Sequence, residues 1–463
     1  MRLLNIAIVG GGPGGLMTAY RLQQQLTAPM HVTLFEASER LGGKLQTKSF
    51  VKASAHYEAG AAELYDYSMI DEDPLKELVG ELGLFAIPMG GSSVILDNRV
   101  LTNLDDIQEH FGTEVLEALT DFDRQAKASM SPREFYSIGH TDPSFSTISA
   151  GRFDTALQNI REPTAQRYIE NLIHSDLATE PKHTSISYGL QNYLMNDPTY
   201  TKLYSIAGGN QRLSHELASR IDATVLLQHT VTAIGSSGRE RIQVTSSAHG
   251  HTRVDDFDFV VIALPMNHLT ALHFHPPRLA HAMRQHHARY NHPAHYLRVT
   301  ILFDRPFWRS VLTDHFLMLD RFGGCCLYDE SAREPESTAA VLGWLMSGQA
   351  ALEMSKLDND ALIEKALGSL PDSLSCGRHS FIEGSVHRWV DAVNALPGGM
   401  PPRGLDERHQ PEPVEHPNLF IVGDYLFDST LNGVLDSATH VAGWMAALGA
   451  SDSFDKSPET LAR

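Results

Sequence analysis

The first forty residues alternate between apolar runs and a glycine cluster in the order strand, helix, strand. Residues 5–9 (NIAIV) form a short, partly β-branched apolar run, which is typical of a buried strand. A glycine cluster follows, and Leu16 and Ala19 within residues 14–26 lie on one face of a predicted helix. Residues 31–36 (HVTLFE) predict a second strand. The chain therefore begins with a predicted βαβ unit.

The pattern is less regular in the middle of the chain. Residues 91–204 mix amphipathic stretches, such as a helix predicted over 105–119, with loops marked by Pro and Gly. Later predicted elements are a helix at 213–221, strands at 224–234, 241–247, 257–265, 296–308 and 418–425, and a helix at 433–450. The polar tail at 451–463 is expected to fray.

Composition and charge narrow the class of protein. The chain has 463 residues, 42% of them hydrophobic and 20% charged, which suits a globular protein with one very large domain or two interleaved domains. Lys and Arg number 37 against 56 Asp and Glu, so the formal net charge is −19. This charge repels phosphate backbones and anionic lipids. We therefore expect neither a nucleic-acid partner nor a membrane partner.

Cysteines and apolar runs indicate the compartment. Three cysteines cannot form a disulfide framework in a chain of this length, and they suit a reducing environment. Adjacent Cys325 and Cys326 leave two interpretations, a redox pair or two buried small side chains, and the second is favoured. No run reaches 18 apolar residues, and the N-terminal run leads into glycines rather than a cleavage site. We expect a cytoplasmic protein.

Histidines gather in one segment. Eight of them lie within residues 268–295, but their spacing matches no familiar zinc site, and no Cys or acid lies among them. We expect a solvated helix and loop there, and no metal site.

Candidate chemistry begins at the glycine cluster. Gly10, Gly12 and Gly15 form a G-x-G-x-x-G motif that follows a predicted strand and opens a predicted helix, which is the context this motif requires. The glycines allow close approach of a pyrophosphate, whose charge the helix N-terminus stabilises. Glu36 stands 24 residues after Gly12, where a carboxylate can accept both ribose hydroxyls; the alternative is a surface acid.

A second glycine pair distinguishes this nucleotide site from the plain NAD motif. Gly42 and Gly43 precede Lys44, which predicts another backbone approach to the phosphates with a cation beside it. The segment 36–44 reads E-A-S-E-R-L-G-G-K. With the first motif it resembles the N-terminus of the flavin amine oxidase superfamily. That superfamily includes monoamine, polyamine and L-amino-acid oxidases, with protoporphyrinogen oxidase and carotenoid desaturases as relatives.

The resemblance spans essentially the whole chain. Residues 418–447 resemble the closing FAD motif of the family, residues 204–217 its GG-x-x-x-L segment, and residues 229–234 the strand that contacts adenine. It implies an α/β fold with a discontinuous, Rossmann-like FAD-binding domain and an interleaved α+β substrate domain. The implied divisions are 1–90, 205–270 and 376–450 for FAD, 91–204 and 271–375 for substrate, and a flexible tail at 451–463.

The resemblance also implies a set of FAD-binding residues. The first glycine motif and the segment 36–44 would bind the ADP half, and Val231 would contact adenine. Asp424 would bind the ribityl or pyrophosphate part, and backbone N–H groups of 433–435 would face the flavin N1/O2 edge. The full set is Gly10, Gly12, Pro13, Gly14, Gly15, Glu36, Ala37, Arg40, Gly42, Gly43, Lys44, Gly60, Ala61, Ala62, Glu63, Val231, Trp389, Gly423, Asp424, Gly433, Val434 and Leu435. The FAD is expected to be non-covalent, because Met400 lies where the monoamine oxidases have their flavin-linked cysteine.

Two positions near the expected flavin depart from the family. Arg298 stands in place of the lysine that holds a water near flavin N5; an arginine can hold a water or an anion but cannot act as a base. The alternative is an exposed strand cation. Val434 is aliphatic where amine oxidases often have an aromatic residue, so only Trp389 is expected to wall the flavin.

The segment YEAGAAEL at 57–64 carries the third departure. It resembles the E-x-G-A-x-R segment of L-amino-acid oxidases, but Glu63 replaces the arginine that binds the substrate carboxylate. An acid disfavours an α-amino-acid substrate and suits an amine, guanidine or imidazole. The alternative is that Glu63 pairs with an arginine inside the fold, with Arg298 a candidate. The small turn 60–62 would let the backbone approach the flavin, and Glu58 is expected to be a structural or cofactor-side acid.

Three functions follow from these features. The first is an FAD-dependent oxidase that removes hydride from a carbon beside nitrogen, with Arg298, Glu63 and Trp389 as active-site residues, and gives imine and hydrogen peroxide with O2. The alternative is an FAD-dependent dehydrogenase or desaturase on a larger apolar substrate. The third is a flavin-binding protein without catalysis. The expected partners are a small-molecule substrate and O2, and a homodimer is left open.

Overall fold

The computed structural model describes residues 2–69, 72–91, 93–137, 151–236, 241–312, 314–333, 339–395 and 403–450. These residues form two compact units. Unit 1 comprises the described residues of Met1–Leu45, Gln211–Asn291 and Pro402–Arg463, and unit 2 those of Gln46–Asn210 and His292–Pro401. The units are bounded differently from the expected domains: residues 46–90, 205–210 and 376–401 fall in unit 2 and residues 271–291 in unit 1. Sheet pairing gives the reason, because strands from 46–90 and 381–394 pair only with other strands of unit 2.

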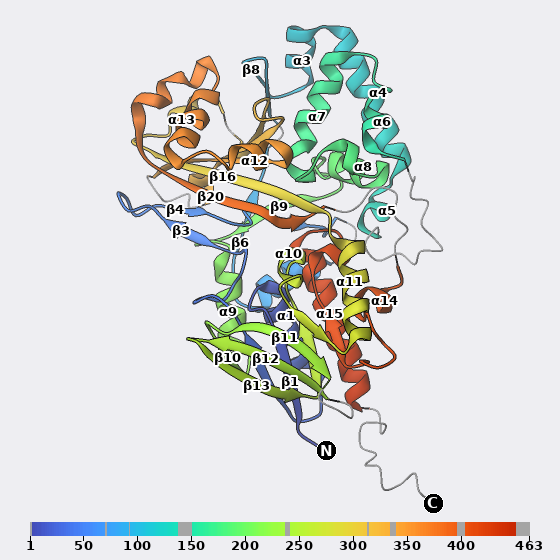
Figure 1. Cartoon of the computed structure of the whole chain (residues 1–463). Coiled ribbons are helices and arrows are strands. Elements are labelled where there is room, and N and C mark those ends of the chain that lie inside the picture. Colours follow the sequence, from blue (N-terminus) through green and yellow to red (C-terminus); the bar gives the residue numbers. More distant parts are fainter. Residues whose placement is uncertain are drawn as a thin grey trace, which may run out of the picture. The chain divides into compact units, whose positions relative to one another are not determined.

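Unit 1 contains a parallel sheet that confirms the predicted βαβ opening. Its order is β10 (Ala223–Leu226), β2 (Met30–Phe35), β1 (Leu4–Val9), β14 (Phe259–Ile262) and β21 (Leu419–Ile421). All neighbouring strands run parallel, and the apolar side chains of β2, β1, β14 and β21 are almost all buried, as expected for a sheet covered on both faces; those of the edge strand β10 are partly exposed. Helix α1 (Pro13–Gln25) packs against α15 (Leu431–Ala450), as Figure 1 shows in blue and red.

A second sheet in unit 1 corrects two predictions. Its order is β13 (His251–Phe257), β12 (Ile242–Ala248), β11 (Thr230–Ser236) and β15 (His273–His275). The single strand predicted over 224–234 is wrong, because the chain turns at Gln228, which has a φ of 56°, and β10 and β11 join different sheets. Strand β13 was not predicted, since its sequence HTRVDDF is mostly polar and exposed.

The histidine-rich segment is only partly solvated. It contributes β15 and α11 (Pro277–Tyr290), and His286 on α11 is 5% exposed. The remaining helices of unit 1 are α9 (Gln211–Arg220), α10 (Met266–Leu269), α14 (Leu405–His409) and the short η6 (Asp424–Leu426). No group of three or more potential metal ligands is found within the described residues.

Unit 2 is built on a seven-stranded sheet. Its order is β20 (Phe381–Asn394), β16 (Pro293–Phe303), β19 (Ala340–Ser347), β18 (Cys325–Asp329), β17 (Phe316–Leu319), β7 (Val94–Leu96) and β8 (Arg99–Leu101). Two small sheets accompany it, β5 (Leu64–Asp66), β9 (Lys202–Ile206) and β6 (Ala86–Met89), and the pair β3 (Thr47–Ser49) and β4 (His56–Glu58). Cys325 and Cys326 on β18 are buried, so the interpretation as small core side chains is confirmed.

Helices surround the sheets of unit 2. They are α2 (Pro74–Glu81), α3 (Leu104–Phe111), α4 (Thr113–Ser129), α5 (Pro132–Ser137), α6 (Phe153–Leu157), α7 (Pro163–Leu177), α8 (Ile186–Leu194), α12 (Gly348–Met354), α13 (Asn359–Ser369), and the short η2 (Pro181–His183), η3 (Phe307–Ser310), η4 (Glu330–Arg333) and η5 (Asp372–Ser380). The single helix predicted over 105–119 is broken at Gly112, whose φ of 91° ends α3 and starts α4. Among the described residues, no helix combines the length and the apolar character needed to cross a bilayer.

Candidate active site

The first glycine motif forms a tight turn between β1 and α1 in unit 1. Gly10 has a φ of 110°, and a Cβ on Gly15 would stand 2.0 Å from the carbonyl oxygen of Gly10, so both positions require glycine. A Cβ on Gly12 would meet no protein atom closer than the Gly43 Cα at 3.8 Å. The Gly12 side of the turn therefore leaves room for a ligand, and the N–H groups at the start of α1 suit a phosphate.

Glu36 lies at the end of β2 with its carboxylate fixed. Its Oε2 accepts a hydrogen bond from the Gly11 N–H and its Oε1 one from the Ser38 N–H, both at 2.8 Å. The carboxylate thus stands beside the glycine turn, where the sequence prediction places a ribose. The neighbouring Ala37 is exposed.

The second glycine pair is held by Arg40. The guanidinium donates to the carbonyl oxygens of Leu41 at 3.1 Å and Gly43 at 2.5 Å, so Arg40 braces the loop with part of its donor capacity. Gly42 and Gly43 have φ values of 105° and 50°. Lys44 extends its Nζ to 3.9 Å from the carboxylate of Asp424.

Of the backbone N–H groups of 433–435 that were expected to bind the flavin edge, some already have hydrogen-bond partners within the protein. Gly433 donates its N–H to the Thr430 hydroxyl at 3.2 Å, and Val434 donates to the Thr430 carbonyl at 3.1 Å. Two of the N–H groups expected at the flavin edge are therefore engaged in the first turn of α15. Val231, the expected adenine contact, is buried on β11. The open glycine turn, the fixed Glu36 and the cationic Lys44 together fit a dinucleotide such as FAD.

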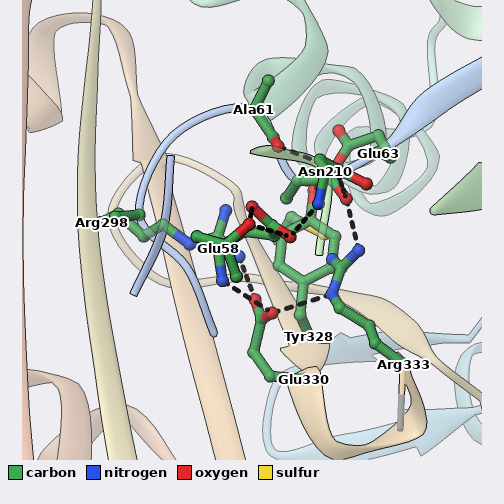
Figure 2. A network of polar contacts seen from close by, with 12 residues as sticks. Glu58, Ala61, Glu63, Asn210, Arg298, Tyr328, Glu330 and Arg333 are labelled. Atoms are coloured by element: carbon green, nitrogen blue, oxygen red, sulfur yellow. Dashed lines mark hydrogen bonds and ion pairs between the residues drawn. The ribbon is translucent and has the colours of Figure 1, made fainter. Parts of the chain in front are cut away.

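In unit 2, the small turn 60–62 is held by Asn210. The Asn210 side-chain amide donates to the carbonyl oxygens of Ala61 and Ala62, each at 3.0 Å (Figure 2). The Asn210 N–H donates to the Glu58 carboxylate at 2.8 Å, and the Thr47 hydroxyl lies 3.1 Å from the same carboxylate. Glu58 is 1% exposed, and burial raises its pKa to about 7. Glu58 is therefore a structural acid of this turn.

Arg298 is buried, which corrects the alternative of an exposed strand cation. It lies on β16, is 1% exposed, and forms an ion pair with Glu330 (Figure 2). Arg333 donates from its Nε to the other oxygen of Glu330 at 2.8 Å. The alternative in which Arg298 pairs with Glu63 is also wrong, because Glu330 is the ion-pair partner of Arg298 in the described part of the chain.

Glu63 instead accepts a hydrogen bond from the Tyr328 hydroxyl at 2.6 Å (Figure 2). The Tyr328 ring lies against both guanidiniums, 4.9 Å from the Arg298 Cζ and 5.7 Å from the Arg333 Cζ. Glu63 remains partly exposed. It therefore has a neutral hydrogen-bond donor, and among the described residues no ion pair neutralises its charge.

A second acid lies within electrostatic reach of Glu63. Asp176 on α7 accepts a hydrogen bond from the Asn196 amide at 3.2 Å. Burial, and then the charge of Glu63, raise the pKa of Asp176 to about 8. Burial and the charges of both acids also raise the pKa values of the tyrosines at 65 and 296, which are partly exposed. This part of unit 2 is acidic and aromatic.

Trp389 on β20 contacts the chain just before the small turn. Its indole Nε1 donates to the Ala59 carbonyl at 2.7 Å, which fixes the ring beside Gly60. Its strand neighbour His387 lies 3.2 Å from the Tyr57 hydroxyl. The structure thus groups Trp389, Arg298, Glu63 and the small turn within unit 2.

Sequence reasoning missed the residues that connect this group. They are Asp176, Asn210, Tyr328, Glu330 and Arg333. Asn210 had a local signal, since it follows the glycine pair at 208–209. Glu330 and Arg333 have the i,i+3 spacing of a helical ion pair, but nothing in the sequence connects them to a strand residue 32 positions earlier.

Comparisons with known proteins agree with this architecture. The family model described as flavin containing amine oxidoreductase matches residues 13–445. Prenylcysteine oxidase 1-like of Bos taurus is 26% identical over 287 residues, which cover 57% of this chain and 56% of that protein. A probable flavin-containing monoamine oxidase A of Dictyostelium discoideum is 22% identical over 359 residues, which cover 73% of this chain and 74% of that protein.

The fold is also that of solved structures. A double mutant of putrescine oxidase aligns with a TM-score of 0.78 and 20% identity, covering 96% of this chain and all of the other. The chain spans little more than half the length of the prenylcysteine oxidase relative. The family match nevertheless covers both units almost completely. The chain therefore belongs to the family of flavin-containing amine oxidoreductases.

Proposed function

We propose that the protein oxidises the C–N bond of a cationic amine, with O2 as the final electron acceptor. The observation that carries this proposal is the state of Glu63. It is a partly exposed carboxylate, hydrogen-bonded to a neutral tyrosine and within reach of a second acid, Asp176. Such a carboxylate attracts an ammonium or guanidinium group and repels a carboxylate group.

The residues have distinct roles in this proposal. Bound FAD supplies a hydride acceptor. In unit 1, the glycine turn, Glu36 and Lys44 would hold the dinucleotide, without a covalent bond. In unit 2, Tyr328 holds one oxygen of Glu63, and Trp389 offers an indole face fixed through Ala59. Glu63 would then orient the substrate cation, and Arg298, which keeps its proton, would not act as a base.

The test is anaerobic reduction of the purified yellow protein. A panel of amines, amino acids, and tetrapyrrole or polyene compounds is mixed with the protein, and the visible flavin absorbance is followed. Bleaching by amines, with peroxide formed on admitting air, supports the proposal. Bleaching by none of the amines contradicts it.

A Glu63→Arg variant tests the recognition step. We expect its affinity for a cationic substrate to fall by on the order of a hundredfold, because attraction becomes repulsion. A Glu364→Arg variant is the control, since Glu364 is an exposed acid of the same unit on α13. Equal affinity of the Glu63→Arg variant and the wild type for the cation would contradict the role of Glu63.

A dehydrogenase or desaturase of a larger apolar substrate is the second candidate. Two observations favour it: a buried, ion-paired Arg298 stands where related oxidases have a lysine, and prenylcysteine oxidases are among the relatives. Bleaching by an apolar compound followed by slow reoxidation in air would support this candidate instead.

A further inference from the structure

The charges around Glu63 balance without the second acid of this region, Asp176. Glu330 forms ion pairs with both guanidiniums, Arg298 and Arg333 (Figure 2). The charge of Glu63 also acts on Arg298, so two cations face two carboxylates. A substrate cation that binds at Glu63 therefore brings a positive charge that these four side chains do not match.

Asp176 lies where a carboxylate is hard to ionise. It is the last residue but one of α7, at the negative end of the helix dipole. It accepts a hydrogen bond from the Asn196 amide at 3.2 Å, and among the described residues the charge that acts on it is the negative charge of Glu63. Burial, and then that charge, raise the pKa of Asp176 to about 8, so without a bound cation its carboxyl group is mostly protonated at pH 7.

Glu63 and Asp176 face the same group of side chains. The Tyr296 hydroxyl donates to the Ser175 carbonyl at 2.8 Å, which connects this ring to the residue next to Asp176. The groups that face Asp176 are Glu63 before β5, Tyr65 on β5, Tyr296 on β16, Cys326 on β18 and Asn196 after α8. Both acids act on the tyrosines and on the thiol of this group, and both acids are partly exposed. A cation bound among these side chains would therefore lie within electrostatic reach of both acids.

We propose that Asp176 is a second acid of the substrate site, which releases its proton to solvent when the substrate cation binds and then shares that cation with Glu63. The charges of the site are balanced before binding, when Asp176 is protonated, and after binding, when the new carboxylate matches the substrate. Each bound cation displaces one proton, so acid competes with the substrate. This inference rests on the proposed function, because the cation is the amine that would be oxidised.

The test counts the protons released when a cation binds that the protein cannot oxidise. The probes are tert-butylammonium and its phenyl-substituted analogue cumylammonium, because the carbon beside nitrogen carries no hydrogen in either of them. The FAD-loaded protein is titrated by calorimetry at pH 6 and pH 7 in buffers of different ionisation enthalpy, and the dependence of the heat on the buffer gives the protons released per cation.

We expect close to one proton per cation at pH 7, because a group with a pKa of about 8 is mostly protonated there. The affinity should rise by about tenfold from pH 6 to pH 7, since the proton that must leave becomes easier to remove. Binding without proton release, or equal affinity at the two pH values, would overturn this inference but leave the role of Glu63 intact. Failure of both probes to bind would contradict the cation site itself, which bleaching by amines tests separately.

Two variants and a control identify the acid that releases the proton. Asp176→Asn keeps an acceptor for the Asn196 amide and replaces a group that is mostly neutral at pH 7, so it should fold; we expect it to release no proton and to bind the probes roughly tenfold or more weakly at pH 8. Glu58→Gln removes another acid of unit 2 whose pKa is raised by burial, to about 7, and should still release the proton.

Asp123→Asn is the matched control, because Asp123 is a partly exposed acid of unit 2 that already has a cation, Lys127. It should release as many protons as the wild type. Proton release that persists in Asp176→Asn, or that disappears in Glu58→Gln instead, would refute the role of Asp176. A purely structural role of Asp176 would change stability but not the number of protons released per cation.

Discussion

At the scale of single residues, the fold assigns different partners to acids that are close in sequence. Glu58 and Glu63 are only five positions apart. Glu58 is buried and accepts a hydrogen bond from a backbone N–H, whereas Glu63 is partly exposed and accepts one from a tyrosine hydroxyl. Arg298 shows the same effect among cations, because its ion-pair partner is Glu330 and not Glu63, for which the sequence offered Arg298 as a candidate partner. The effect of replacing one of these charged residues can therefore be interpreted only when its hydrogen-bond or ion-pair partner is known.

Tyr328→Phe tests how the cation-binding acid is held. The variant loses the 2.6 Å hydrogen bond to Glu63 but keeps the aromatic ring against both guanidiniums. We expect the KM for a cationic substrate to rise by about tenfold and the free energy of unfolding to fall by up to roughly 1.5 kcal/mol, the contribution of a hydrogen bond to a charged group.

Tyr204→Phe is the matched control. Tyr204 is also buried in unit 2, and its hydroxyl has no hydrogen-bond partner among the described residues. Equal KM values for the Tyr328→Phe variant and this control would show that Glu63 does not depend on Tyr328.

At the scale of elements, the sequence predicts what is encoded locally. The βαβ opening was predictable because apolar runs, glycines and helix periodicity lie within about 35 residues of one another. The break between β10 and β11 was not, because Gln228 takes a positive φ that depends on contacts with distant residues: its N–H donates to the Ser38 carbonyl, and β10 and β11 pair in different sheets. The arginine network was equally inaccessible, since it joins β4, β16, β18 and η4, and no local pattern specifies such contacts.

Gly12→Ala tests the glycine turn. The added Cβ would meet no protein atom within 3.8 Å, so the variant should fold with nearly unchanged stability. We expect it to retain much less FAD than the wild type after gel filtration, because the methyl group occupies space left for the pyrophosphate.

Gly80→Ala serves as the comparison, since a Cβ there also meets nothing within 4 Å but Gly80 lies on α2 of unit 2 and is not part of the glycine turn. If Gly12→Ala kept as much FAD as Gly80→Ala, the pyrophosphate would not pass this side of the turn.

At the scale of the whole molecule, stability in acid depends on contacts between distant segments of unit 2. Glu180 accepts hydrogen bonds from the His174 ring at 3.2 Å and the Gln349 N–H at 2.9 Å, which connects α7 to α12. The hydrogen bond from His174 is the main cause that lowers the pKa of Glu180 to about 2. A lowered pKa means that ionised Glu180 stabilises the fold above pH 4.5 and that this contribution is lost as the pH falls toward 2.

Glu180→Gln should therefore unfold more easily than the wild type at pH 6, and the difference should shrink as the pH approaches 2. Urea unfolding at intervals between these values measures it. Glu353→Gln on α12 is the control, because the Glu353 carboxylate accepts an exposed hydrogen bond from the Gln349 side-chain amide at 2.9 Å within the same helix. A constant difference between Glu180→Gln and the wild type across this range would contradict the lowered pKa.

The discontinuous make-up of unit 1 has a consequence for synthesis of the chain. Among the described elements of unit 1, strand β1 leaves the ribosome before all others, whereas the edge strand β21 and α15, which packs against α1, leave it after the other strands and helices. All described strands of unit 2 emerge before β21, so unit 2 can complete its sheets while unit 1 cannot. The apolar strands β1 and β14 must therefore wait, incompletely covered, until β21 and α15 have been synthesised. We expect nascent chains truncated before residue 419 to expose these strands to chaperones and proteases, even though they already contain every strand of the seven-stranded sheet.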